Sequence, residues 1–145
     1  METWKRILRD GLLRLLTEEE LQALRRGLAA HDPALQQGLM TLPPPLECLH
    51  DWQVEGADLT AYPAWRGRGL KTVREVEEAA WSLCSAIDAR LGEGAVKELL
   101  AWYDATPRAD VLAVLLGEVE REMMIRMVRQ AAGATGRRMP RCNSA

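Results

Sequence analysis

Apolar side chains recur at three- and four-residue steps through residues 72–90, which is the clearest helical pattern in the chain. Such positions share one face of a helix, so we expect that face to be buried. Thr72 and Glu75 have the spacing of a capping box, and Gly92 suits the residue that ends a helix. We expect the other segments to pack around this helix. Its apolar positions are Val73, Val76, Ala80, Leu83, Cys84, Ile87 and Leu91.

The N-terminal part of the chain predicts three shorter helices. The first covers residues 4–16 and combines apolar positions with Lys and Arg side chains. The second begins at Thr17, which can form a capping box with Glu20, and ends near residue 30. The third begins at Asp32 and Pro33, a cap followed by proline in the first turn, and continues to about residue 41.

Two further helices are predicted near the C-terminus. Residues 95–104 have one apolar face, and Thr106 with Pro107 is typical of the start of a last helix covering residues 108–132. This last helix is apolar around most of its circumference, so either it lies inside the fold or its methionine-rich end contacts a second subunit. The second reading predicts a homo-oligomer formed through residues 108–132.

Residues 42–71 lack clear periodicity and contain the run Pro43, Pro44 and Pro45. We therefore predict an all-α fold, an irregular bundle of five or six helices with a long proline- and tryptophan-containing loop between its two halves. Residues 1–132 would form one domain, made of N-terminal helices (1–41), the irregular excursion (42–71) and core helices (72–132). Residues 133–145, rich in Arg and Gly, are expected to form a flexible basic tail.

The charge of the chain is small in total and uneven in distribution. The formal net charge is −2 over 145 residues. Residues 31–104 carry six basic and twelve acidic side chains, a net −6, and the flanking segments together carry +4. A mixed, solvated surface explains this pattern, and so does a surface that orients the protein toward a charged partner.

Three cysteines at irregular spacing do not indicate a disulfide framework, so we expect a reducing, cytoplasmic environment. We expect no membrane-spanning segment, because charged residues interrupt every long apolar run. The basic helix at residues 4–16 could lie on an anionic membrane or dock on its own domain. Since it is short and contains Gly11, we favour docking and expect no membrane partner.

Cys48 and His50 form the one Cys/His cluster of the sequence. They suggest a metal site or a nucleophile with its base, but the spacing gives neither four ligands nor a third orienting group. No phosphate-binding glycine motif is present. We therefore expect no enzyme activity, no cofactor and no bound metal, and an enzyme or metalloprotein using Cys48 and His50 remains the third hypothesis.

The leading hypothesis is a non-enzymatic adaptor or regulatory subunit that binds another protein. Aromatic and arginine side chains dominate protein interfaces, and the irregular segment is rich in both. The predicted partner-binding residues are Trp52, Tyr62, Trp65, Arg66 and Arg68.

Nucleic-acid binding is the alternative hypothesis, because arginines neutralise phosphates and an aromatic ring can stack on an unpaired base. The sequence pI of about 5.8 argues against it. The residues that would serve are Arg66, Arg68, Arg137, Arg138 and Arg141.

Overall fold

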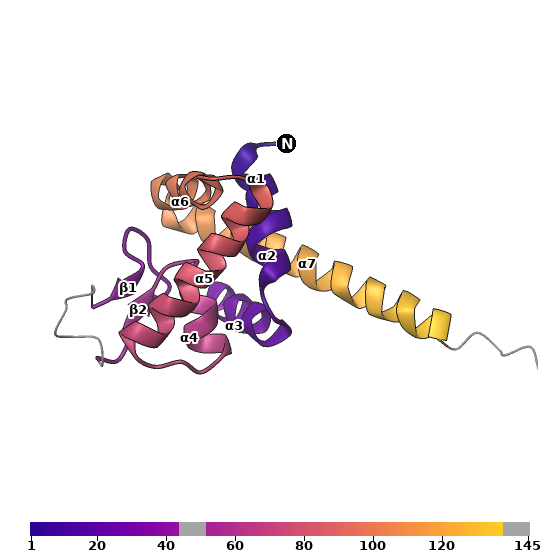
Figure 1. Cartoon of the computed structure of the whole chain (residues 1–145), viewed down its shortest axis with the longest axis horizontal. Helices are drawn as coiled ribbons and strands as arrows, with labels where there is room; N and C mark the ends of the chain where they lie inside the picture. The colour runs from indigo at the N-terminus through magenta and orange to yellow at the C-terminus, as the bar shows by residue number, and fades with distance from the viewer. Residues whose placement is uncertain (44–51, 138–145) are drawn as a thin grey trace, which may run out of the picture.

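The structure is a computed structural model that describes residues 1–43 and 52–137 (Figure 1). Its N-terminal helix is continuous and consists of α1 (Thr3–Ile7), the π-helical turn η1 (Leu8–Leu12) and α2 (Leu13–Leu15). The other helices of the described residues are α3 (Glu18–Ala29), α4 (Tyr62–Gly67), α5 (Val73–Leu91), α6 (Ala95–Ala105) and α7 (Arg108–Arg137). Strands β1 (Thr41–Leu42) and β2 (Gly56–Ala57) pair antiparallel. The prediction of an irregular all-α bundle is confirmed.

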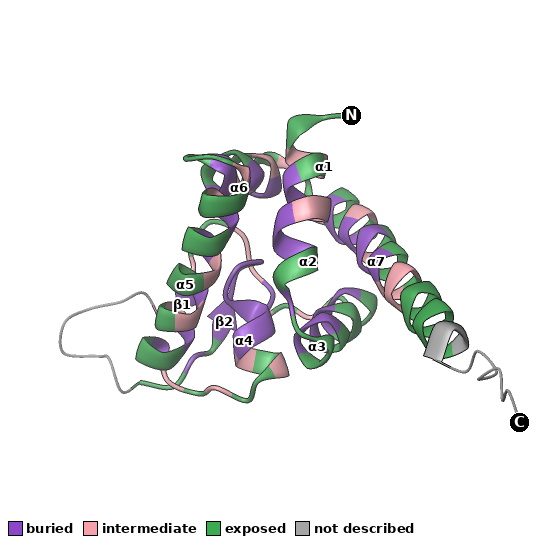
Figure 2. Cartoon of the chain, turned by 45° about the vertical axis from the view of Figure 1, so that its right-hand side comes forward, coloured by how far each residue is buried: buried purple, intermediate pink, exposed green. Residues whose placement is uncertain are grey.

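The N-terminal helix occupies the centre of the fold, between α5 on one side and α7 on the other (Figure 1, Figure 2). Leu8, Leu12 and Leu13 are fully buried. Gly11 permits a close approach to α5, since a Cβ atom there would lie 2.9 Å from Leu91 Cδ1. The expectation that this helix docks on its own domain is therefore confirmed, and its glycine is part of the packing rather than a break.

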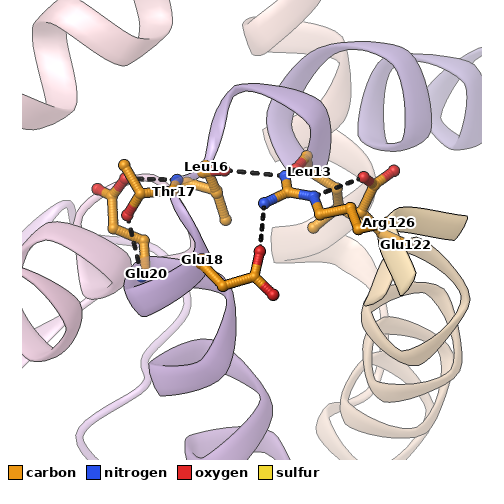
Figure 3. A network of polar contacts seen from close by, with 7 residues as sticks. All are labelled: Leu13, Leu16, Thr17, Glu18, Glu20, Glu122 and Arg126. Carbon is orange, nitrogen blue, oxygen red and sulfur yellow. Dashed lines mark hydrogen bonds and ion pairs between the residues drawn. The ribbon is translucent and has the colours of Figure 1, made fainter. Parts of the chain in front are cut away.

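Three polar or aromatic contacts fix the N-terminal helix to the last two helices. The Trp4 ring stacks on Trp102 of α6, with ring centroids 3.8 Å apart. Arg9 donates two hydrogen bonds to the Glu118 carboxylate, at 2.6 and 2.9 Å. Arg126 of α7 reaches the end of α2 and donates to two backbone carbonyls there (Figure 3). The ends of the helix and its middle are thus each anchored.

Helix α5 has the predicted apolar face and the predicted capping box. Thr72 accepts a hydrogen bond from the Glu75 N–H, and the Glu75 side chain accepts one from the Thr72 N–H. The helix ends at Gly92, where φ is +112°. Its other face is exposed, however, so α5 covers the core and the expectation that the fold is arranged around it is wrong (Figure 2).

The predicted third helix at residues 32–41 does not form. Its backbone bonds to other segments instead: the Gln36 N–H donates to Ala57 O, and the Gln36 carbonyl accepts from the Tyr103 hydroxyl. Arg108 donates to the carbonyls of Asp32 and Leu35. These partners come from distant parts of the chain, and local periodicity carries no information about them.

The expected irregular excursion at residues 42–71 is only partly irregular. It contains β2 and then α4, with Pro63 in the first turn of the helix. Asp58 starts this turn because its carbonyl accepts from Tyr62 N–H and its carboxylate accepts from Thr60 and Ala61 N–H. Cys48 and His50 lie outside the described residues, so the predictions about them stay predictions.

Helix α7 has 30 residues and continues to Arg137, beyond the end predicted near residue 132. The first residues of the expected flexible tail are therefore helical. Thr106 does not cap α7; its hydroxyl donates to Trp102 O in the helix before. The first half of α7 packs on the body, and its second half projects away from it (Figure 1).

Candidate protein-binding surface

The outer face of α5 carries the most exposed aromatic ring among the described residues. Trp81 is 62% exposed, whereas Val76, Ala80 and Ile87 of the buried face are fully buried. Because α5 is held by its buried face, the Trp81 ring is presented on a rigid support rather than on a loop. Exposed tryptophan is uncommon, and a ring of this size contributes strongly to interfaces.

Two open hollows lie side by side on this face and share Glu78. The first, of about 380 Å³, is lined by Arg74, Glu77, Glu78 and Trp81. The second, of about 320 Å³, is lined by Arg68, Leu70, Glu75, Glu78, Ala79 and Ser82. We call these residues together the Trp81 surface. It joins the end of α4 to the first half of α5.

Local contacts hold two of its three carboxylates in place. Glu75 is bonded to the hydroxyl and the N–H of Thr72, and these hydrogen bonds lower its pKa. Glu77 accepts a hydrogen bond from the Thr41 hydroxyl at 3.0 Å, which ties β1 to α5. At neutral pH the surface therefore combines fixed negative charge with an apolar ring, an arrangement suited to a partner that carries cationic and apolar side chains.

Tyr62, one of the predicted partner-binding residues, is buried rather than exposed. The residue is 3% exposed, and its hydroxyl donates to Asp32 Oδ2 at 2.7 Å. Burial and this hydrogen bond raise the pKa of Tyr62 well above its usual value. Its ring meets Trp65 edge to face, with centroids 5.9 Å apart, so Tyr62 supports α4 from inside.

Trp65 and Arg66 form a stacked pair. The Arg66 guanidinium lies 3.9 Å from the centre of the half-buried Trp65 ring, and 3.9 Å from Asp32 Oδ2. Burial alone would raise the pKa of Asp32, but hydrogen bonds from Tyr62 and Ala34 and the nearby Arg66 and Arg108 lower it overall. The Arg66 side chain thus interacts with Trp65 and Asp32, on the side of α4 that faces Asp32.

Arg68 and Trp52 lie on the α5 side instead. Arg68 is exposed and lines the hollow next to Leu70. Trp52 is 52% exposed, and its carbonyl accepts from the Val73 N–H, which places it beside the start of α5. The predicted residues therefore separate: Arg68 borders the Trp81 surface, Trp52 lies beside its helix, and Arg66 faces another side of α4.

Of the arginines of the nucleic-acid hypothesis, those that the structure describes are not brought together. Arg66 and Arg68 are at the end of α4, whereas Arg137 ends α7, which points away from α4 in both views (Figure 1, Figure 2). Arg138 and Arg141 lie outside the described residues. Glu75 and Glu78 line the same hollow as Arg68 and would repel a phosphate backbone.

Other chemistry is sparse in the part of the chain that the structure describes. No group of three or more His, Cys, Asp or Glu side chains there is placed to hold a metal ion. Cys84 is buried, and burial raises the pKa of its thiol to about 11. A thiol with such a pKa is a poor nucleophile at neutral pH.

Sequence reasoning assigned no function to Trp81 or Leu70. In the helical pattern of residues 72–90, Trp81 falls at the edge of the apolar stripe, beside Glu77. The sequence does contain a signal for it. A tryptophan that follows a Glu-rich turn and falls outside the buried positions is a large apolar group facing solvent. Leu70 could not have been found this way, since its position depends on how α4 meets α5.

No helix of the described residues is long and apolar enough to cross a lipid bilayer. In comparisons with known proteins, no family model matches the chain, and no curated protein and no solved structure matches it at a significant level.

Proposed function

We propose that this protein is a non-enzymatic binding module whose Trp81 surface holds a basic segment of another protein. The observation that supports this most directly is the exposed Trp81 ring among the carboxylates of a rigid helix. A cationic side chain can pair with these carboxylates while an apolar neighbour covers the indole. Leu70 and Ala79 add apolar contact in the adjoining hollow.

The electrostatics favour a basic partner over an acidic one. Glu75, Glu77 and Glu78 line the two hollows, against Arg68 and Arg74. The surrounding stretch of chain, residues 31–104, carries a net −6. A negative surface steers a basic segment toward it and speeds association at low salt. Trp52, one of the predicted partner-binding residues, lies beside the start of α5 and would contact one end of that segment.

A peptide-display selection tests the proposal without knowledge of the natural partner. Random twelve-residue peptides are selected on the immobilised full chain and then compared on Trp81→Ala and on the control Leu15→Ala, which alters an exposed leucine away from the surface. We expect enriched peptides that combine Lys or Arg with an aromatic or branched apolar residue. They should bind Leu15→Ala normally and Trp81→Ala at least about tenfold more weakly.

Charge reversal at the shared residue gives a second readout. Glu78 lines both hollows, so Glu78→Lys should abolish binding of the basic peptides and leave the helical circular dichroism unchanged. Enrichment of peptides that bind Trp81→Ala and Glu78→Lys as tightly as the original protein would show that another surface is used.

A further inference from the structure

Helix α7 has an exposed face that runs from residue 113 to residue 128. The residues that pack on the body lie on the opposite side, and they include Val111, Leu115, Val119 and Glu122. With 100° per residue, the outward positions are those about half a turn away from these. The outward positions are Ala113, Gly117, Glu120, Arg121, Met124 and Val128, all of them exposed.

Where α7 leaves the body, its apolar side chains lie on the outward side of the helix instead of the side that faces the body. Met124, Met127 and Val128 are 59%, 62% and 61% exposed, and they fall on or near the outward side. Arg129 and Gln130, on the side of the helix nearer the body, are polar. If this end only needed to be solvated, the outward side would be polar as well. The apolar end is therefore arranged to contact something beyond the body.

The outward side of the first half of α7 is complementary in shape to this apolar end. It presents Ala113 and Gly117, and a Cβ atom at Gly117 would have no neighbour within 4 Å. Small residues on one helix let the larger side chains of another approach closely. The large side chains of the second half of this face can therefore pack on the small residues of its first half.

The charges at the centre of this face are self-complementary too. Glu120 and Arg121 are adjacent, exposed and opposite in charge, whereas Glu118, Glu122 and Arg126 are bonded within the subunit. An antiparallel copy of the same helix places each of the two exposed charges opposite its counter-charge. A second copy of this chain therefore suits the face better than an unrelated helix.

We propose that two copies of the protein pair through antiparallel α7 helices, with the two-fold axis between Glu120 and Arg121. In this register Met124 packs on Gly117 of the partner subunit, and Val128 packs on Ala113 of the partner subunit. Glu120 pairs with Arg121 of the partner subunit. Each contact occurs twice, as a two-fold interface requires.

The arrangement leaves room for both bodies. Each body lies on the side of its α7 opposite to the outward face, so the two bodies end up on opposite sides of the helix pair (Figure 1, Figure 2). Glu120 also lies 3.5 Å from Arg25 at the exposed surface of its own subunit. That contact does not block the face, because both side chains are about half exposed.

Sedimentation equilibrium from 1 to 100 µM, on the order of the range for weak dimers, tests the pairing. We expect the mass to approach two chains for the full-length protein and for Gln130→Glu, which adds a charge on the other side of the same helix. Met124→Glu should weaken the dimer at least about tenfold. A single-chain mass at every concentration, or a dimer unchanged by Met124→Glu, would overturn the proposal.

Charge exchange tests the register. Glu120→Arg and Arg121→Glu should each weaken the dimer about tenfold, because like charges then face each other twice. The double variant should restore it. For direct proximity, Gly117→Cys and Met124→Cys proteins, both with Cys48 and Cys142 replaced by serine, are treated with a short bismaleimide. Cross-linking should require a mixture of the two proteins; efficient cross-linking of Met124→Cys alone would indicate parallel helices and refute this pairing.

Discussion

At the scale of single residues, the glycine with the least room for a side chain is Gly27 of α3, which contacts Tyr62 of α4. A Cβ atom at position 27 would lie 2.2 Å from the Tyr62 hydroxyl oxygen. That hydroxyl cannot easily move, because it is buried and bonded to Asp32. The glycine is therefore required for the two helices to meet at this distance.

We predict that Gly27→Ala destabilises the protein by about 2 kcal/mol, the usual cost of overpacking, although alanine is the better helix former. The free energy of unfolding in urea measures this. Gly133→Ala, where a Cβ atom meets nothing within 4 Å, is the matched control and should cause no loss. If Gly27→Ala were as stable as the original chain, the contact between α3 and Tyr62 would be looser than described.

Asp58 is a carboxylate in the interior. It is 5% exposed, and burial raises its pKa to about 6, although Thr60 and Ala61 donate hydrogen bonds to it. An unfolded chain releases this proton near the ordinary pKa of 3.8. Between these two values the folded state holds more protons than the unfolded state, so the contribution of Asp58 to stability falls as the pH rises.

The variant Asp58→Asn should remove that dependence. Its amide oxygen can accept the same three hydrogen bonds, all of which go to Oδ1. We predict that, relative to Asp58→Asn, the original protein loses about 2 kcal/mol between pH 4 and pH 6.5. Urea unfolding of both proteins across this range measures the difference between their free energies of unfolding. The contributions of the other carboxylates are the same in both proteins and cancel in this difference. A free energy of unfolding of the original protein that stays constant or rises with pH, relative to that of Asp58→Asn, would contradict the assignment.

At the scale of elements, Arg126 connects α7 to the end of the N-terminal helix (Figure 3). It donates to Leu13 O at 2.7 Å and Leu16 O at 2.8 Å, and pairs with Glu122 at 2.8 Å and Glu18 at 3.4 Å. The carbonyls at a helix C-terminus lack partners within the helix, so a cation there both satisfies and stabilises them.

We predict that Arg126→Lys destabilises the fold by about 2 kcal/mol, since an ammonium cannot reach two carbonyls and two carboxylates with the geometry of a guanidinium. Arg129→Lys, an exposed position of the same helix, should have no effect. Thermal unfolding followed by circular dichroism compares the two. Equal melting temperatures would mean that Arg126 is not a structural connection.

Elements with strong local signals could be predicted from the sequence, and those held by distant contacts could not. Both capping boxes, at Thr17 and Thr72, form as predicted because each involves residues only three apart. The segment after Asp32 was misread as a helix because its cap and proline were present, while its partners Tyr103 and Arg108 are far away in the sequence.

The candidate site shows the same division. An exposed Trp81 follows from its position on a helix, so it was within reach of the sequence. The burial of Tyr62 was not, because it depends on Gly27 of another helix. The hollows that flank Trp81 also depend on the meeting of α4 with α5, and the sequence alone does not give that geometry.

At the scale of the whole molecule, two faces are separated by the body. The Trp81 surface lies on α5, and the free side of α7 lies beyond the central N-terminal helix (Figure 1, Figure 2). A dimer formed through α7 would therefore present two Trp81 surfaces on its outer sides. Two linked sites bind a repeated or clustered partner more tightly than one, by raising the local concentration for the second contact.

Binding at the Trp81 surface is the central functional claim, and calorimetric titration of a selected basic peptide tests it most directly. The account predicts saturable binding to the full chain, at least about tenfold weaker binding to Trp81→Ala, and no measurable binding to Glu78→Lys. Equal dissociation constants for all three proteins would contradict it.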